Sequence, residues 1–150
     1  MADAALPSEL VRQFEPLGAL GRGAMGMVVR ARDRATGREV ALKLAIDAVT
    51  PERLARFARE GSLTASLDHP GIVRVVAFGH LEDATENLFG RRFERGTPYV
   101  AMEWLEGEDL QVRQRRAPLS LRQALDVGRQ IAAALAAAHD AGVIHRDIKP

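Results

Sequence analysis

Residues 14–45, FEPLGALGRGAMGMVVRARDRATGREVALKLA, decide the fold of this chain. Two bends interrupt an otherwise strand-like stretch: a glycine cluster at Gly21, Gly23 and Gly26, and the polar sequence DRATGR at residues 33–38. Turn-forming residues between β-branched and apolar runs predict antiparallel strands joined by tight connections. We therefore expect three strands, at about residues 14–22, 26–33 and 38–45, after a short polar lead over residues 1–13.

A helix and two more strands follow this stretch. Thr50 and then Pro51 favour a helix start, and the apolar spacing beyond them predicts a helix over about residues 51–67. Short β-rich runs at residues 72–79 and 97–104 predict the fourth and fifth strands. A charged stretch, residues 80–96, separates them, and no role can be assigned to it.

The last part of the chain is helical by its pattern. Ser120 and Gln123 form a capping box, apolar residues follow at helical spacing, and Gly142 closes the helix. The order of strands, one inserted helix, further strands and then helices indicates an α+β fold with segregated layers, not a βαβ alternation.

Composition narrows the classes of function. The chain has 150 residues, of which 47% are hydrophobic, and a formal net charge of +1. Its basic residues are spread along the sequence, so we expect no nucleic-acid partner. It has no cysteine, and its four histidines lack ligand spacing, so no metal site of its own is expected. The absence of a long apolar run predicts a cytoplasmic location with no membrane segment.

The glycine cluster carries the first candidate site. Its sequence is Leu20-Gly21-Arg22-Gly23-Ala24-Met25-Gly26-Met27-Val28, which contains G-x-G-x-x-G-x-V. Glycines at this spacing let a backbone turn approach phosphates without a Cβ clash. A plain glycine-rich hairpin is the alternative for the motif alone. A dinucleotide-binding turn is disfavoured, because that motif needs a helix directly after the glycines, whereas MVVRARD reads as a strand.

Two lysines stand out because every other basic residue is arginine. Lys43 follows Val40-Ala41-Leu42 on the third predicted strand, where alternation places Ala41 and Lys43 on one face, toward the glycine loop. An ordinary solvated lysine is the alternative to a phosphate contact. Glu60, in the predicted helix, could pair with Arg56 on the surface or orient Lys43.

Residues 143–150, VIHRDIKP, provide the second candidate site, although a charged loop after a helix is the plain alternative. Asp147 and Lys149 pair a carboxylate that can activate a hydroxyl with a cation that can neutralise a transferring phosphoryl group.

In combination and in this order, the motifs resemble those of the eukaryotic-like protein kinases, and more narrowly the bacterial Ser/Thr branch. The resemblance covers about residues 15–150. It implies an N-lobe of five antiparallel strands plus helix C over about residues 14–103, a hinge at about 104–107, and the first C-lobe helices over about 108–150. The catalytic-loop asparagine and the DFG aspartate, which hold Mg²⁺ in the family, are expected past residue 150.

The resemblance also implies a role for each matching residue. The glycine loop would cover the ATP phosphates, Lys43 would contact the α and β phosphates, and Glu60 would hold Lys43. Asp147 would be the catalytic base, and Lys149 fits the Ser/Thr pattern. The residues expected around the adenine are Leu20, Val28, Ala41, the gatekeeper Met102, and the hinge from Glu103 to Leu105.

The function expected from this resemblance is phosphoryl transfer from ATP, with Mg²⁺, to Ser or Thr hydroxyls of protein substrates. The 150 residues alone are expected to be inactive without those metal ligands. A pseudokinase that binds nucleotide or serves as a scaffold is the main alternative, and small-molecule phosphotransfer on the same fold is a third. Thr64 departs from the family pattern, since many members have a larger apolar residue there.

Overall fold

The computed structural model describes residues 8–23, 26–45, 50, 64–88, 91–145 and 148–149. The chain forms two compact units. Met1–Ala65 and Arg74–Trp104 make up unit 1, and Ser66–Val73 and Leu105–Pro150 make up unit 2. Most of the helix predicted over residues 51–67 lies outside the described residues; within its described end, Thr64 and Ala65 are helical.

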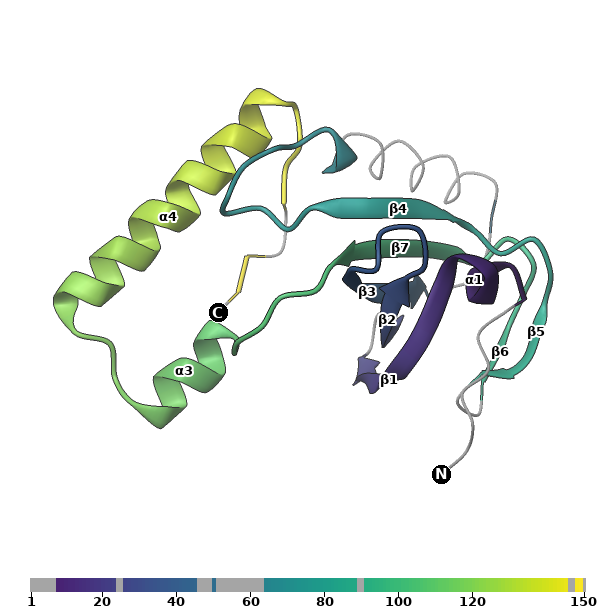
Figure 1. Cartoon of the computed structure of the whole chain (residues 1–150). Coiled ribbons are helices and arrows are strands. Elements are labelled where there is room, and N and C mark those ends of the chain that lie inside the picture. The colour runs from purple at the N-terminus through teal and green to yellow at the C-terminus, as the bar shows by residue number, and fades with distance from the viewer. Residues whose placement is uncertain are drawn as a thin grey trace. The chain divides into compact units, whose positions relative to one another are not determined.

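Unit 1 is built on a five-stranded antiparallel sheet, which confirms the predicted strands (Figure 1). The strand order is β1-β2-β3-β7-β4. Its members are β1 (Phe14–Gly23), β2 (Gly26–Asp33), β3 (Glu39–Ala45), β4 (Val75–His80) and β7 (Pro98–Glu103). β4 starts later than predicted, because the Ile72 amide donates to the His69 carbonyl in a local turn, 2.9 Å away.

One face of this sheet forms the hydrophobic core. Along β3, Val40, Leu42 and Leu44 are buried while the residues between them are half-buried, as period-2 alternation requires. The core also contains residues of β1, β2, β7 and the segments around them. Its members are Leu10, Phe14, Met27, Val29, Ala31, Val40, Leu42, Leu44, Leu81, Phe93 and Ala101. On the opposite face of β3, the side chains are half-buried.

The segment predicted to be a polar lead contains a short helix, α1 (Ser8–Gln13). Leu10 is only 1% exposed and belongs to the core. Arg34, in the β2–β3 turn, donates from its amide to the Gln13 carbonyl (2.9 Å) and from Nε to the Val11 carbonyl (2.9 Å). Residues 8–13 are therefore part of the folded unit.

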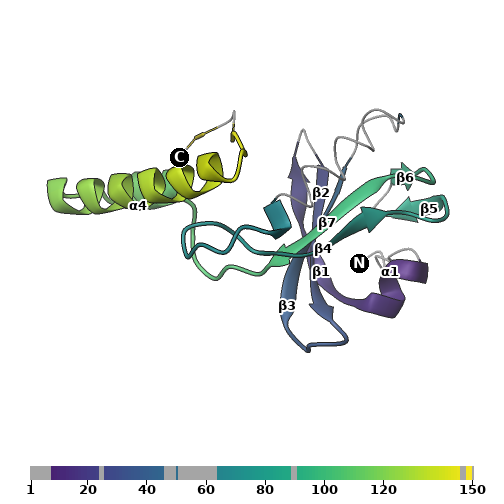
Figure 2. The same cartoon turned by 90° about the horizontal axis from the view of Figure 1, so that it is seen from above.

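The charged stretch between β4 and β7 folds as a separate two-stranded hairpin, β5 (Thr85–Leu88) and β6 (Arg91–Phe93). Figure 2 shows this hairpin at the same end of the sheet as α1. Its base is buried: Leu81 and Phe93 join the core, and the Leu81 amide donates to the Thr97 carbonyl at 2.9 Å. The insertion thus extends the core of unit 1.

Unit 2 contains two helices, α3 (Leu110–Arg116) and α4 (Leu121–Asp140). The predicted capping box is confirmed: the Gln123 amide donates to Ser120 Oγ at 3.3 Å, and the Ser120 amide donates to Gln123 Oε1 at 2.9 Å. Gly142, at a φ of 77°, follows the helix, and its amide and that of Val143 donate to the His139 and Ala138 carbonyls. This is the bonding pattern of a Schellman ending.

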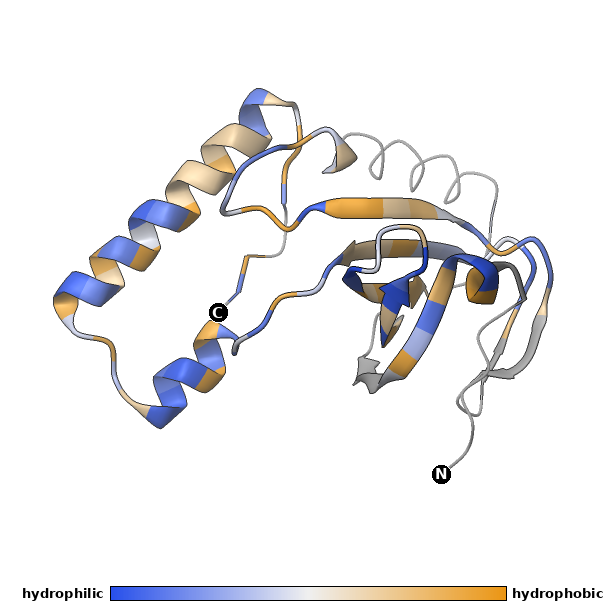
Figure 3. Cartoon of the chain, viewed as in Figure 1, coloured by the Kyte–Doolittle hydropathy of each residue, from blue (hydrophilic) through white to orange (hydrophobic). Residues whose placement is uncertain are grey.

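The surface of α4 is mixed. Figure 3 shows hydrophobic and hydrophilic bands in its first half and a mildly apolar second half. Leu121 is 77% exposed and Leu125 is 64% exposed. Across the residues that the structure describes, no helix combines the length and apolarity needed to cross a bilayer.

Candidate functional site

The strand register places four of the predicted site residues on the sheet face opposite the core. Lys43 of β3 is paired with Val28 of β2 on one side and with Val100 of β7 on the other. In the next row, Ala41 is likewise paired with Arg30 and Met102. Directly paired residues in a sheet project from the same face, so Val28, Ala41, Lys43 and Met102 share one surface.

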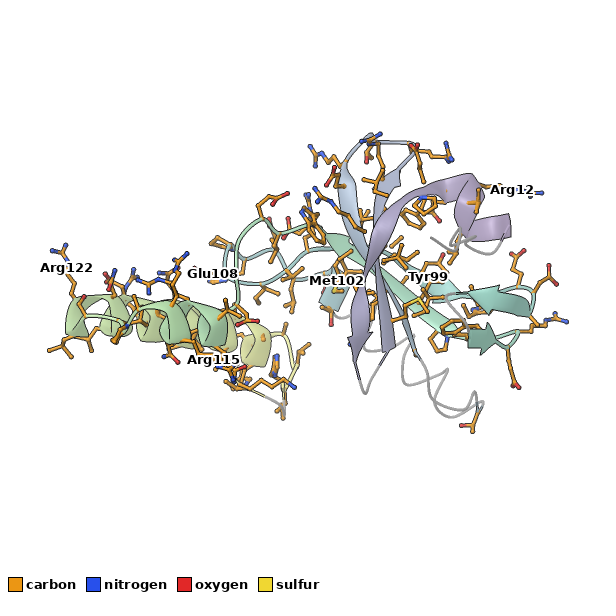
Figure 4. The ribbon with its side chains drawn as sticks, turned by 90° about the horizontal axis from the view of Figure 1, so that it is seen from below. Arg12, Tyr99, Met102, Glu108, Arg115 and Arg122 are labelled. Atoms are coloured by element: carbon orange, nitrogen blue, oxygen red, sulfur yellow. The ribbon has the colours of Figure 1, made fainter. Side chains whose placement is uncertain are left out.

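All four of these residues are half-buried. Figure 4 labels Met102 and Tyr99, both on β7. Alternation along the strand assigns Tyr99 to the core face, and Tyr99 packs against the core. Met27 also belongs to the core face, because its side chain is 2% exposed. A role for Met27 at the site is therefore limited to its backbone.

The glycine cluster forms the tip of the β1–β2 hairpin. Gly21 pairs with Val28, Arg22 with Met27, and Gly23 with Gly26, with a register shift between Ala19 and Gly21. The loop therefore joins two antiparallel strands, which excludes the strand-to-helix turn of a dinucleotide-binding fold. Ala24 and Met25, at the very tip, lie outside the described residues, and for Leu20 and Arg22 the structure describes the backbone alone.

At the end of β7, backbone amides hold the predicted hinge in place. The Glu103 amide donates to the Arg74 carbonyl (2.9 Å), and the Arg74 amide donates to Glu103 Oε1 (2.8 Å). The Trp104 amide donates to the Glu39 carbonyl at 3.2 Å. No acceptor for the Leu105 amide occurs within the described part of the chain. The amides of Glu103 and Trp104 are therefore both engaged within unit 1.

A cluster that the sequence analysis missed lies beside this hinge. Arg30 Nε donates to Glu39 Oε2 at 2.7 Å, and a second guanidinium nitrogen lies 2.5 Å from the same oxygen. The Arg30 guanidinium carbon is 4.6 Å from the centroid of the Trp104 ring, within cation–π range. The DRATGR turn could have placed Arg30 and Glu39 on facing strands, but nothing in the sequence pattern brings Trp104 to them.

Comparison with known proteins agrees with this geometry. The model of the protein kinase domain family matches residues 14–150. The chain belongs to the protein kinase family. Its curated relatives include the serine/threonine-protein kinase PknA of Mycobacterium tuberculosis, with 42% identity over 134 residues. Another is the serine/threonine-protein kinase pkn3 of Myxococcus xanthus, with 39% identity over 134 residues.

Each alignment covers 87% of this chain, but only 29% of PknA and 22% of pkn3. Among solved structures, the kinase domain of M. tuberculosis PknI matches with a TM-score of 0.76 and 28% identity. That match covers 100% of this chain and 56% of the PknI chain. The recognition of a bacterial Ser/Thr kinase relative and of the kinase N-lobe fold is thereby confirmed.

Several residues that a kinase needs fall outside the part of the chain that the structure describes. Glu60 and Asp147 are among them, so the predicted pairing of Glu60 with Lys43 and the placement of the catalytic base stay predictions. In unit 2, Lys149 is described and exposed. In unit 1, the structure places Val28, Ala41, Lys43 and Met102 on one face of the sheet.

Proposed function

We propose that this chain is the nucleotide-binding part of a kinase that transfers the γ-phosphoryl group of ATP to Ser or Thr hydroxyls of proteins. The observation that carries the proposal is the shared face of β2, β3 and β7, which combines a small residue, a cation and a glycine hairpin. Ala41, paired with Arg30 and Met102, has the smallest side chain of its row, and we assign the position above it to the adenine ring. Lys43, in the next row toward the glycine tip, provides a positive charge for phosphates.

The residues present fit ATP in two further respects. An adenine ring needs a backbone hydrogen-bond donor at the hinge, and we assign this role to the Leu105 amide, which has no acceptor among the described residues. Phosphates need backbone amides that can be approached closely, and the hairpin tip with Gly21, Gly23 and Gly26 allows that approach. Bound Mg²⁺ would neutralise the phosphate oxygens during transfer.

The roles of the remaining residues follow from the same chemistry. Phosphoryl transfer asks the protein mainly for positioning and charge stabilisation. We assign Glu60 to hold the Lys43 ammonium in place, Asp147 to accept the proton of the attacking hydroxyl, and Lys149 to stabilise charge on the transferred group. Lys149, in the HRDIK sequence, favours Ser/Thr over Tyr acceptors, in line with the names of the curated relatives.

Intact-mass spectrometry of the whole protein incubated with Mg·ATP tests this proposal. We expect added phosphate on Ser or Thr in the parent, and none in Lys43→Met or Asp147→Asn. Arg38→Met, which removes an exposed cation from the β2–β3 turn, serves as the matched control and should phosphorylate normally. A parent that is stabilised by ATP but modifies neither itself nor added protein substrates would instead be a pseudokinase.

A further inference from the structure

The Arg30, Glu39 and Trp104 cluster is not needed for any role assigned above. We propose that Arg30 is a positioning residue for the nucleotide face of unit 1: held by Glu39, its guanidinium stacks on Trp104 and fixes the end of β7 beside the row of Ala41 and Met102. This inference rests on the proposed ATP site. It adds a residue outside the glycine loop, the lysine and the hinge itself to the determinants of nucleotide affinity.

Glu39 contacts both members of the stacked pair, which closes a ring of interactions. Its carbonyl accepts the Trp104 amide at 3.2 Å, and its carboxylate accepts Arg30 Nε at 2.7 Å. Arg30 then reaches Trp104 through its guanidinium, 4.6 Å from the ring centroid. Trp104 is thus held through both its backbone and its side chain, which restricts rotation of the chain at this residue.

The position of Trp104 gives this restraint its significance. Trp104 directly follows β7, and Arg30 is paired with Ala41 in the row that also contains Met102. The stack therefore borders the residues proposed to face adenine. A binding face that is already ordered saves the entropy of ordering it when the ligand arrives, so affinity increases without a new ligand contact.

A second ion pair on β2 shows what an ordinary surface pair looks like here. A guanidinium nitrogen of Arg32 lies 3.7 Å from Glu15 Oε2, and both side chains are 44% exposed. The Arg30 and Glu39 side chains are less exposed, at 36% and 31%, and are joined at 2.5 Å. Exposed pairs such as Arg32–Glu15 contribute little. Arg32→Met is therefore a matched control for Arg30→Met on the same strand.

The stack itself can be tested without nucleotide. Trp104 is the only tryptophan of the 150 residues, and subtracting the spectrum of Trp104→Phe isolates its emission in the whole protein. A cation over the indole ring alters its excited state, so Arg30→Met should change the emission maximum or intensity. Arg32→Met should leave both unchanged. Unchanged emission in Arg30→Met would overturn the proposal, whatever the protein does with ATP.

Nucleotide binding tests the consequence of the stack. We expect Arg30→Met to weaken Mg·ATP binding about three- to tenfold and to raise KM for ATP by the same factor, with kcat within about twofold of the parent. In a Trp104→Leu background the same substitution should have no further effect, because Arg30 acts through the ring. A stability defect alone would not produce this dependence on Trp104.

The outcomes separate this inference from the function on which it rests. A parent protein that binds no ATP overturns the proposed function, and this role of Arg30 with it. Normal ATP affinity in Arg30→Met overturns the role of Arg30 alone. So does an equal loss of affinity with and without Trp104, since Arg30 would then act by another route.

Discussion

Replacing Leu10 by alanine tests whether the helix before β1 is part of the folded kinase unit. Leu10 is 1% exposed and lies in the core with Phe14. Leu→Ala at a fully buried position costs about 2 to 5 kcal/mol, from lost transfer free energy plus the cavity left behind. The cost for Leu10 should fall near the lower end, about 2 to 3 kcal/mol, because a six-residue helix can shift away from the sheet instead of keeping a cavity.

The same substitution at Leu17 is the matched control. Leu17 lies on β1 and is 39% exposed. Its truncation removes less buried apolar surface than that of Leu10, so we expect the free energy of unfolding to fall by about 1 kcal/mol or less. Urea unfolding of each variant, followed by the emission of Trp104 in unit 1, measures the difference. Equal stabilities for Leu10→Ala and Leu17→Ala would refute the argument and make residues 8–13 a dispensable lead.

Two further predictions concern the helix end and the nucleotide face. Gly142→Ala should destabilise the protein by about 1 kcal/mol, because Gly142 has a φ of 77°. Gly128 lies inside α4 with open space around it, so Gly128→Ala should stabilise the protein by up to about 1 kcal/mol. Thermal unfolding of the two variants measures both effects. Ala41→Phe should fill the space proposed for adenine and weaken ATP binding at least tenfold in a calorimetric titration, and unchanged binding would contradict the assignment of that face.

The strands were predictable from sequence where turn chemistry marks both ends. β2 begins at the last glycine of the cluster and ends where Asp33 opens its turn, accepting the Ala35 amide at 2.8 Å. Hydrogen bonds of this kind depend on residues that are neighbours in the sequence, so the bounds of β2 were predicted correctly. The capping box and Gly142 fixed α4 in the same way.

The elements that were missed depend on distant partners. α1 contributes the buried Leu10 and the partly buried Val11 to the core, and two adjacent apolar positions give no helical periodicity. The sequence of the β5–β6 hairpin resembles a charged loop. Its buried residues, Leu81 and Phe93, lie at the two ends of this segment and give no strand pattern between them. The signals for both elements come from packing against the sheet, which a window along the sequence cannot contain.

The residues of the candidate site likewise differ in whether sequence alone could identify them. The glycine spacing, Lys43 and the HRDIK sequence could be recognised from residue types at fixed offsets. The contact between Arg30 and Trp104 joins residues far apart in the chain, and it depends on side-chain conformations that no offset encodes. Sequence therefore identifies the groups that would touch ATP more readily than those that hold them in place.

The division into two units has a topological consequence. Unit 2 takes residues 66–73 from the middle of the chain, between the two segments of unit 1, in addition to everything after Trp104. The backbone therefore passes from one unit to the other at three points: after Ala65, after Val73 and after Trp104. After a single break in the hinge, residues 66–73 of unit 2 stay covalently joined to unit 1, whereas residues 105–150 become a separate chain. Neither unit can be expressed alone as one uninterrupted stretch of the gene.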